Sequence, residues 1–160
     1  MRENVQIRIA RLLKHSGQTL STAESCTGGQ IAHLLTTVSG SSAWYLGGVV
    51  SYAISVKEQV LGVSDELIRE QGVVSGEVAS AMAEGVRKLT GSNWAVATTG
   101  LAEGGDGRYP EGTVWMAVSG PTGIFTRKYH CNLGRTGNIR RFATTALLFL
   151  AQKIDDFIKD

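Results

Sequence analysis

Hydrophobic residues recur at three- and four-residue spacing in four stretches of the chain, which is the spacing of one helical face. The stretches predict a first helix that ends at Gly17, a second helix after the glycines at residues 28–29, a helix capped by Ser75, and a final helix over residues 136–157. Shorter helical segments are expected from Ser41 or Ser42, over residues 55–61, and after Ser64. In chain order the four hydrophobic stripes are Val5, Ile9, Leu12 and Leu13; Ile31, Leu34, Leu35 and Val38; Val78, Met82, Val86 and Leu89; and Ile139, Phe142, Ala146, Leu150, Ile154 and Phe157.

Stretches rich in β-prone residues separate these helices. The expected strands cover residues 19–22, 47–53, 94–99, 113–119 and 124–131, and the G-P-T-G turn between the last two predicts a β-hairpin. Strands that alternate with helices are typical of parallel pairing, whereas a hairpin is antiparallel. The pattern therefore predicts one domain over the whole chain, an α/β fold in the form of a three-layer α/β/α sandwich whose mixed β-sheet includes the late hairpin.

Composition and charge restrict the class of protein. Hydrophobic residues make up 42% of the 160 residues and charged residues 19%, which is typical of a globular domain. The net charge of +2 comes without a long basic run, so we expect no nucleic-acid partner. No stretch has the length of a membrane span and the first residues lack the apolar region of a signal peptide. We therefore expect no membrane association, a cytoplasmic location, and reduced thiols at Cys26 and Cys131.

The sequence T-A-E-S-C-T-G-G at residues 22–29 combines a carboxylate, a thiol and three hydroxyls. Because it joins an expected strand to an expected helix, its backbone N–H groups and the positive end of the helix dipole face whatever binds above the turn. Such a turn suits a phosphate, a carboxylate or a developing oxyanion. The alternative is that Thr27 caps the helix, Gly28 and Gly29 only make the turn, and Cys26 belongs to the core.

Several kinds of site find no support in the sequence. His15, His33 and His130 are scattered, and neither H-E-x-x-H nor C-x-x-C occurs, so no metal site is expected. The G-x-S-x-G motif and the dinucleotide fingerprint are also missing. Serine or threonine chemistry with a lysine base remains, and Lys57 suits this role if burial lowers its pKa. The alternatives are a solvated surface charge for Lys57 and an ordinary loop residue for Arg135, which could otherwise bind an anion before the last helix.

A series of motifs in order along the chain resembles one known family. The motifs are T-A-E-S-C-T-G-G, then G-S-S-A-W-Y, then G-G-V-V-S-Y with a lysine five residues after the tyrosine, then T-T-G before a glycine-rich loop, and finally G-T-V-W. This chain is similar to the CinA C-terminal family, the nicotinamide-nucleotide amidases, over residues 9–151. Larger members of that family carry an additional N-terminal nucleotide-hydrolase domain. Because 160 residues leave no room for that additional domain, the resemblance implies the stand-alone amidase form.

The resemblance implies hydrolysis of the carboxamide of nicotinamide mononucleotide (NMN) to nicotinate mononucleotide and ammonia, without a metal or a cofactor. It assigns the nucleophile to Ser42, the second serine of G-S-S, and the general base to Lys57. A neutral lysine can take the proton of a serine that attacks an amide carbon, as in Ser-Lys variants of the catalytic triad. The further catalytic residues that it implies are Tyr52, Ser25 and Thr99. The expected substrate-binding residues are Arg135, Glu24, Gly28, Gly29 and Gly100.

Three questions stay open at this point. The substrate phosphate could bind to Arg135 or to the Gly28–Gly29 turn. Ile54 stands where the family usually has an asparagine, and Glu103 replaces part of its usual G-I-A-G-P loop, so the substrate could be a different small amide. A nucleotide-binding module without catalysis is the third possibility. The expected partners are a small pyridine nucleotide and further copies of the chain.

Overall fold

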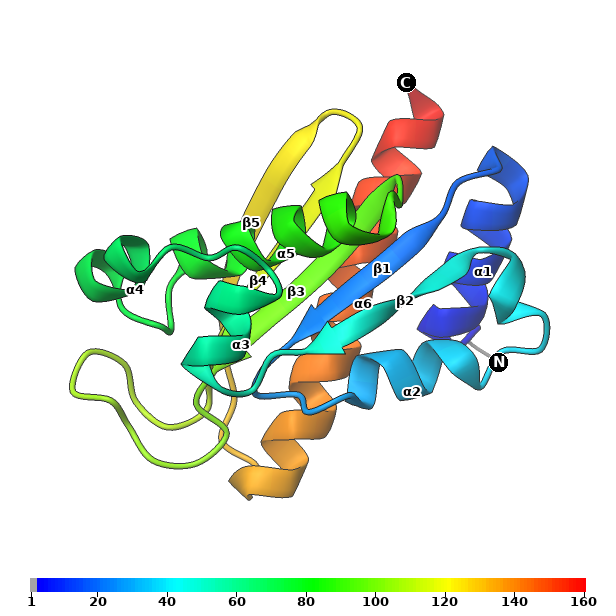
Figure 1. Cartoon of the computed structure of the whole chain (residues 1–160). Coiled ribbons are helices and arrows are strands. Elements are labelled where there is room, and N and C mark those ends of the chain that lie inside the picture. Colours follow the sequence, from blue (N-terminus) through cyan, green and yellow to red (C-terminus); the bar gives the residue numbers. More distant parts are fainter. Residues whose placement is uncertain (1–2) are drawn as a thin grey trace.

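The computed structural model describes residues 3–160 and contains one five-stranded sheet between two layers of helices (Figure 1). The strand order is β2-β1-β3-β4-β5. The strands are β1 (Leu20–Glu24), β2 (Tyr45–Val50), β3 (Trp94–Gly100), β4 (Thr113–Gly120) and β5 (Gly123–His130). The helices are α1 (Val5–Ser16), α2 (Gln30–Thr36), the 3-10 helix η1 (Ser41–Ala43), α3 (Ile54–Gln59), α4 (Asp65–Gln71), α5 (Gly76–Thr90) and α6 (Gly134–Lys159).

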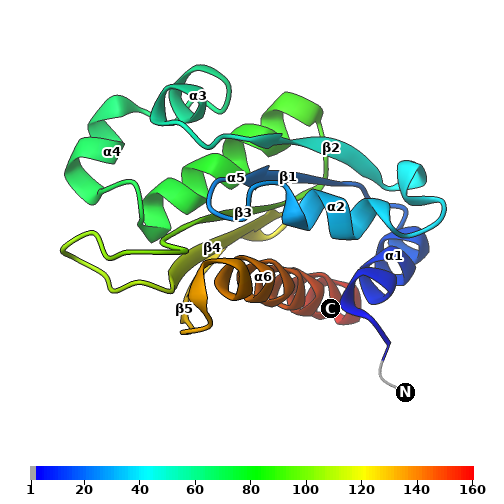
Figure 2. The same cartoon turned by 90° about the horizontal axis from the view of Figure 1, so that it is seen from below.

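The sheet is mixed, as the sequence predicts. Strand β1 pairs in parallel with β2 on one side and with β3 on the other, whereas β3, β4 and β5 pair antiparallel. Seen from below, α1, α2 and α6 cover one face of the sheet, and α3, α4 and α5 lie over the other (Figure 2). The expected three-layer α/β/α sandwich with its late hairpin is therefore confirmed.

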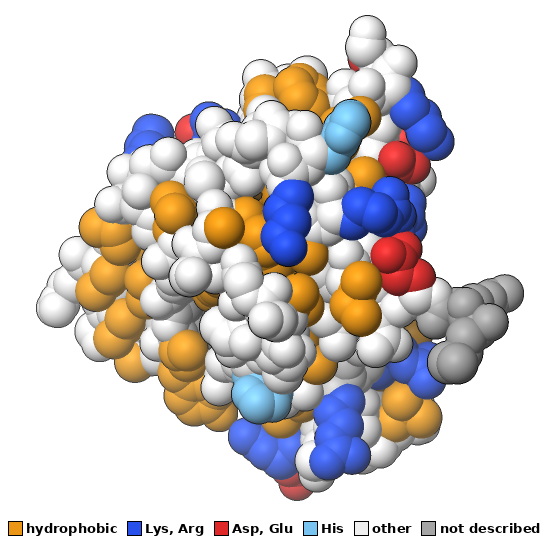
Figure 3. Space-filling view, turned by 90° about the vertical axis from the view of Figure 1, so that its right-hand side faces the viewer, with side chains coloured by type: hydrophobic (Ala, Val, Ile, Leu, Met, Phe, Trp, Pro, Cys, Tyr) orange, Lys and Arg blue, Asp and Glu red, His pale blue; other side chains and the backbone are white. Residues whose placement is uncertain are grey.

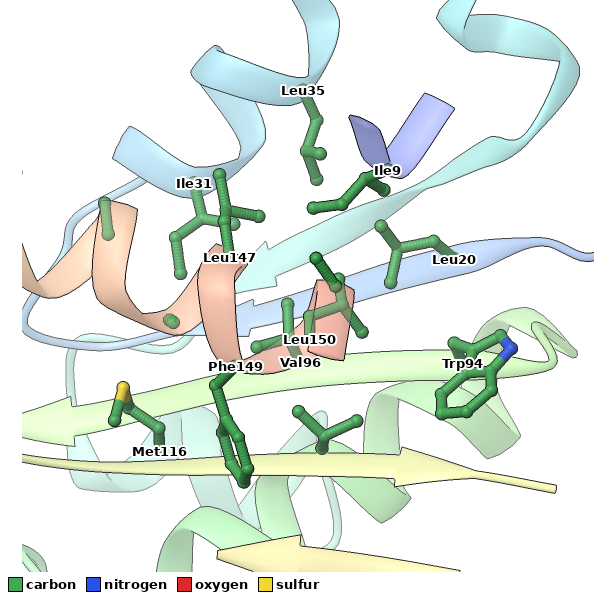
Figure 4. Close-up of a cluster of buried hydrophobic side chains, with 14 of the residues drawn as sticks. Ile9, Leu20, Ile31, Leu35, Trp94, Val96, Met116, Leu147, Phe149 and Leu150 are labelled. Carbon is green, nitrogen blue, oxygen red and sulfur yellow. The ribbon is translucent and has the colours of Figure 1, made fainter. Parts of the chain in front are cut away.

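Two hydrophobic cores lie on opposite faces of the sheet. The larger one packs the stripes of α1, α2 and α6 against the sheet, and Figure 4 shows Ile31 and Leu35 of α2 close to Leu147 of α6. The smaller core packs α4 and α5 against alanines and valines of the other face, with Met82 of α5 fully buried. Alternate strand residues point to opposite faces, so one strand serves both cores.

The helix ends follow the expected chemistry, with a few shifts. Ser64 and Ser75 cap α4 and α5 through their hydroxyls, and Gly17 ends α1 in the left-handed conformation. The short helix η1 begins at Ser41, as expected, and Gly40 is its N-cap residue in place of a serine. Leu89, expected on the buried face of α5, is 57% exposed because it lies in the last turn of that helix.

The topology brings several loops to one edge of the sheet. Strands β1, β2 and β3 run in the same direction, so the residues that follow each strand meet at their carboxyl ends. The turn at residues 25–29, the segment at residues 51–53 and the long loop that follows Gly100 all lie at this edge, and α6 begins beside them (Figure 1). Open α/β sheets bind ligands at this edge, so a ligand site is expected there.

Candidate active site

A cavity of about 250 Å³ opens at the carboxyl ends of the three parallel strands. Its walls come from the turn after β1, the segment after β2 together with α3, the approach to α5, the loop after β3, and the first turn of α6. The lining residues are Ser25, Cys26, Tyr52, Ile54, Lys57, Val73, Val74, Thr99, Gly100, Leu101, Ala102, Glu103 and Arg135. Six of the residues expected from the sequence thus share one cavity: Ser25, Tyr52, Lys57, Thr99, Gly100 and Arg135.

Lys57 is the central buried polar group of this cavity. It lies on the short helix α3 and is 1% exposed, so its alternative interpretation as a solvated surface charge is wrong. Its Nζ donates to Ser25 Oγ at 2.8 Å, to the Ser51 carbonyl at 2.6 Å and to the Tyr52 carbonyl at 3.2 Å. Burial lowers the pKa of the Lys57 amine, because a charged ammonium loses solvation inside the protein.

Ser25 is the first residue after β1 and is fixed by a backbone hydrogen bond to the neighbouring strand. Its backbone N–H donates to the Thr98 carbonyl of the neighbouring strand at 3.1 Å, and the residue is only 9% exposed. Because β1 and β2 are adjacent and parallel, the chain after β2 returns Lys57 to the same sheet edge. A serine hydroxyl within hydrogen-bond reach of a buried lysine is a geometry suited to nucleophilic catalysis.

Cys26 also lines the cavity but is a poor nucleophile. Burial raises the pKa of its thiol to about 12, so the thiolate is scarce near neutral pH. Cys26 and Cys131 are both free thiols, as the sequence predicts. Ser25 is therefore a better candidate nucleophile than Cys26 in this turn.

Thr99 and Gly100 form the wall on the side of β3. The Thr99 hydroxyl donates to the Val73 carbonyl at 2.9 Å, which leaves its oxygen lone pairs to accept from a ligand. Gly100 is tightly packed, because a Cβ there would lie 2.6 Å from the Thr113 carbonyl oxygen. These two residues fix the shape of the cavity where the glycine-rich loop begins.

Arg135 extends over the cavity from the first turn of α6. One guanidinium nitrogen donates to the Tyr52 hydroxyl at 3.4 Å, and another lies 3.6 Å from the Glu103 carboxylate. The hydrogen bond to Tyr52, with a smaller effect from Glu103, raises the pKa of Arg135. Since the Arg135 and Glu103 side chains are 52% and 60% exposed, the ion pair is solvated and weak.

Ser42 lies far from this cavity, so the pairing of Ser42 with Lys57 expected from the resemblance does not form within the chain. Ser42 belongs to η1, which precedes β2, whereas Lys57 follows β2. The six residues of β2 separate the two ends of the strand by about 17 Å. Ser42 is exposed and lines a different recess of about 260 Å³ with neighbours that include Thr36, Tyr45 and Leu46.

Glu24 binds the protein itself rather than a ligand. It is 1% exposed, and its carboxylate accepts from the backbone N–H groups of Ile31 at 2.9 Å and Ala32 at 3.0 Å and from the Thr27 hydroxyl at 2.6 Å. The carboxylate therefore caps the N-terminus of α2, which complements the helix dipole. The expectation that Glu24 contacts the substrate is corrected.

The Gly28–Gly29 turn is likewise not an anion cradle. The first N–H groups of α2 are taken by the Glu24 carboxylate, and the Gly28 N–H donates to the Ser25 carbonyl at 3.1 Å. Neither glycine lines the cavity, and both adopt positive φ angles of 58° and 100°, which the turn requires. Arg135 is the cation of the cavity that remains for an anionic ligand.

The structure also adds residues that the sequence reasoning missed. The carbonyls of Ser51 and Tyr52 hold Lys57 Nζ, and Val73 and Val74 form an apolar wall. Backbone carbonyls carry no sequence signal, and Val73 and Val74 precede Ser75 without any motif of their own. Across residues 3–160, no three His, Cys, Asp or Glu side chains are grouped to hold a metal ion, and no helix is long and apolar enough to cross a membrane.

The sequence is similar to a well-populated group of bacterial proteins. The CinA C-terminal domain family profile matches residues 2–154. A CinA-like protein of Geobacter metallireducens is 43% identical over 155 residues, which cover 95% of this chain and 37% of that protein. A CinA-like protein of Geotalea uraniireducens is 47% identical over 129 residues, which cover 79% and 31%. The chain thus spans about a third of the length of these curated relatives.

Solved structures show the same fold. The competence damage-inducible protein A of Klebsiella pneumoniae superposes with a TM-score of 0.91 at 32% identity, covering 94% of this chain and 95% of that chain. A competence-damaged protein (CinA) superfamily protein of Escherichia coli superposes with a TM-score of 0.90 at 30% identity, covering 94% and 88%. Because the family profile covers nearly its whole length and its relatives reach 43% and 47% identity, the chain belongs to the CinA C-terminal domain family.

Proposed function

We propose that this protein is an amidohydrolase that converts NMN to nicotinate mononucleotide and ammonia, with Ser25 as nucleophile and Lys57 as general base. The observation that carries the proposal is the 2.8 Å contact between Lys57 Nζ and Ser25 Oγ inside the cavity. Burial lowers the pKa of Lys57, which favours the neutral amine that a general base needs. The two carbonyls on Nζ can take both N–H groups of a neutral amine, which turns its lone pair toward the serine.

The reaction divides into two steps that need no group from outside the cavity except water. Ser25 Oγ bonds to the carboxamide carbon while its proton passes to Lys57 Nζ. The C–N bond then breaks, Lys57 returns the proton to the leaving nitrogen, and ammonia departs from an ester on Ser25. Water attacks this ester while Lys57 accepts its proton, the C–O bond to Ser25 breaks, and the proton restores the serine hydroxyl. The product is the carboxylic acid, which gives its proton to the released ammonia or to solvent and leaves as the carboxylate.

The other residues of the cavity suit the two ends of such a substrate. Thr99 offers lone pairs to the N–H groups of a carboxamide, because its own proton is bound to the Val73 carbonyl. Arg135 offers a planar cation to a phosphate, and the Tyr52 hydroxyl helps to orient it. Val73 and Val74 supply an apolar surface for a pyridine ring.

A second candidate is the same chemistry on a small amide without a phosphate. The ion pair between Glu103 and Arg135 favours this second candidate, because the Glu103 carboxylate competes with a phosphate for the Arg135 guanidinium. Ile54 favours it as well, since it places an apolar side chain in the lining where the family usually has an amide side chain.

Ammonia release from a set of nicotinamide compounds distinguishes the two candidates. Purified protein should release ammonia from NMN with a higher kcat/KM than from nicotinamide riboside, which lacks the phosphate, or from free nicotinamide. A higher kcat/KM for the riboside would favour the second candidate, an amidase whose substrate has no phosphate. No ammonia from any of the three compounds would contradict the proposed function.

A further inference from the structure

A buried asparagine joins two walls of the cavity without lining it. Asn138 lies in the second turn of α6 and is 0% exposed. Its Nδ2 donates to the Ala102 carbonyl at 3.0 Å, and its Oδ1 accepts from the Leu133 N–H at 2.9 Å and from the Cys131 thiol at 3.3 Å. The loop after β3, the end of β5 and the start of α6 therefore meet at one amide side chain.

Backbone hydrogen bonds and close packing complete this junction. The Gly112 N–H donates to the Leu101 carbonyl at 2.7 Å, which closes the base of the glycine-rich loop, and the Cys131 N–H donates to the Gly112 carbonyl at 3.0 Å. A Cβ on Gly112 would collide with the Cys131 carbonyl oxygen and would lie 3.5 Å from Asn138 Nδ2. The loop base and the end of β5 therefore approach each other so closely beside Asn138 that only glycine fits at residue 112.

The two segments that Asn138 joins carry Glu103 and Arg135. Glu103 follows Ala102 in the loop, and Arg135 lies three residues before Asn138, about one turn of α6 away. The Glu103 and Arg135 side chains are 60% and 52% exposed, so the ion pair between them is too weak to fix where they lie. The position of each side chain depends on its backbone, and the hydrogen bonds of Asn138 hold the two backbones together.

We propose that Asn138 is a positioning residue, which holds Arg135 at the distance from the loop wall that lets its guanidinium bind the phosphate of the substrate. This inference rests on the proposed function and adds the residue that sets phosphate recognition. A guanidinium forms two parallel hydrogen bonds with a phosphate, and these depend on its orientation. On the face drawn in Figure 3, Lys and Arg side chains are separated by hydrophobic and uncharged ones, so that face offers no dense cluster of cations to a phosphate.

Binding of the reaction product tests this role without any need for turnover. Asn138→Leu introduces a branched apolar side chain and removes all three hydrogen bonds. In calorimetry, Kd for nicotinate mononucleotide should rise by at least about fivefold, whereas Kd for nicotinate riboside, which lacks the phosphate, should change by less than about twofold. A general loss of folded protein would affect both ligands equally. An unchanged ratio of the two Kd values, or a wild type that binds neither compound, would overturn the phosphate role.

A double-mutant cycle shows whether Asn138 acts through Arg135. In the Arg135→Ala background, Asn138→Leu should change Kd for nicotinate mononucleotide by less than about twofold, because the guanidinium that it positions is gone. Additive effects of the two substitutions would overturn the proposal. Asn138→Ala removes the same hydrogen bonds without added bulk, and it takes the place of Asn138→Leu in every experiment if circular dichroism shows that the leucine variant is unfolded.

Limited proteolysis tests the junction without any ligand. Trypsin cleaves after Arg108, an exposed residue of the same loop, and Asn138→Leu should speed this cleavage by at least about fivefold, since the rate follows the population of the open loop. Asn93→Leu is the matched control, because Asn93 Oδ1 also joins two segments, accepting from the Thr19 N–H at 2.8 Å before β1 and β3. The control should leave this cleavage and both Kd values unchanged. Unchanged cleavage in Asn138→Leu would overturn the junction, whereas failure of the amidase itself would appear separately, as no ammonia release from wild-type protein.

Discussion

Each end of β2 has a serine and a lysine side chain nearby, and the two neighbourhoods differ in burial. At the carboxyl end, Ser25 and Lys57 are 9% and 1% exposed and share a hydrogen bond. At the other end, Ser42 is exposed in η1, and the exposed Lys14 places its Nζ 3.9 Å from where a Cβ of Gly40 would lie. Burial lowers the pKa of Lys57. The hydrogen bond to Ser25 Oγ keeps the amine beside the serine hydroxyl. A lysine near a serine is therefore not by itself a candidate general base. Burial at the ligand-binding edge of the sheet distinguishes Lys57 from Lys14.

The largest difference between the two ends of β2 is expected when Lys57 and Lys14 are each replaced by alanine. Lys57→Ala should lower kcat by about a thousandfold or more, because the general base and the nucleophile act as one unit. Lys14→Ala is the matched control and should change kcat by less than about twofold, since exposed surface positions contribute little. Steady-state ammonia release measures both, and circular dichroism checks that the variants are folded. Equal losses in the two variants would refute the assignment of the base.

The pH dependence should report the buried amine. Only neutral Lys57 can accept the serine proton, and its neutral fraction grows as the pH rises through its pKa. Because that pKa is lowered from the usual 10.5, kcat/KM should rise with pH and level off below pH 10.5. A profile measured with the riboside avoids the titration of the phosphate. A rate that falls over the same range would mean that the protonated amine is the active form.

Replacement of Arg135 tests how the cavity recognises the substrate phosphate. Arg135→Ala should raise KM for NMN by about 10- to 100-fold, because it removes the charge-assisted hydrogen bonds that a guanidinium forms with a phosphate. KM for nicotinamide riboside should change far less. Arg140→Ala, an exposed arginine on the same helix, is the control. An equal rise of KM for both substrates would show that Arg135 shapes the cavity without recognising the phosphate.

The smallest effect is expected at Glu103. Glu103→Gln should lower KM for NMN by at most about fivefold, because it removes an exposed and therefore weak ion pair that competes for Arg135. In the Arg135→Ala background the same substitution should have no further effect. A double-mutant cycle on kcat/KM measures this coupling, and additive effects would separate Glu103 from Arg135.

The fold followed from the sequence because its determinants are local. The helical stripes, the caps at Ser64 and Ser75 and the hairpin turn each depend on residues a few positions apart. The contact between Ser25 and Lys57 spans 32 residues and depends on which strands are neighbours. That order was not predicted from the periodicity. The resemblance assigned the nucleophile to Ser42, which the structure places at the opposite end of β2 from Lys57.

Glu24 shows the same limit on a smaller scale. Its position in the motif suggested a ligand contact, but its carboxylate caps α2 through the N–H groups of Ile31 and Ala32. These partners lie seven and eight residues further along the chain. Between them and Glu24 the chain makes a turn in which Gly28 and Gly29 adopt positive φ angles. The spacing alone does not indicate in which direction the carboxylate points. Arg135, by contrast, was correctly placed beside the start of the last helix.

The most direct test of the account compares Ser25→Ala with Ser42→Ala in the ammonia-release assay with NMN. Ser25→Ala should abolish turnover, with a loss in kcat of about a thousandfold or more, because no neighbouring group can form the ester in its place. Ser42→Ala should change kcat/KM by less than about twofold, because Ser42 is exposed in η1 and does not line the cavity. Normal kcat in Ser25→Ala together with an inactive Ser42→Ala would contradict the account.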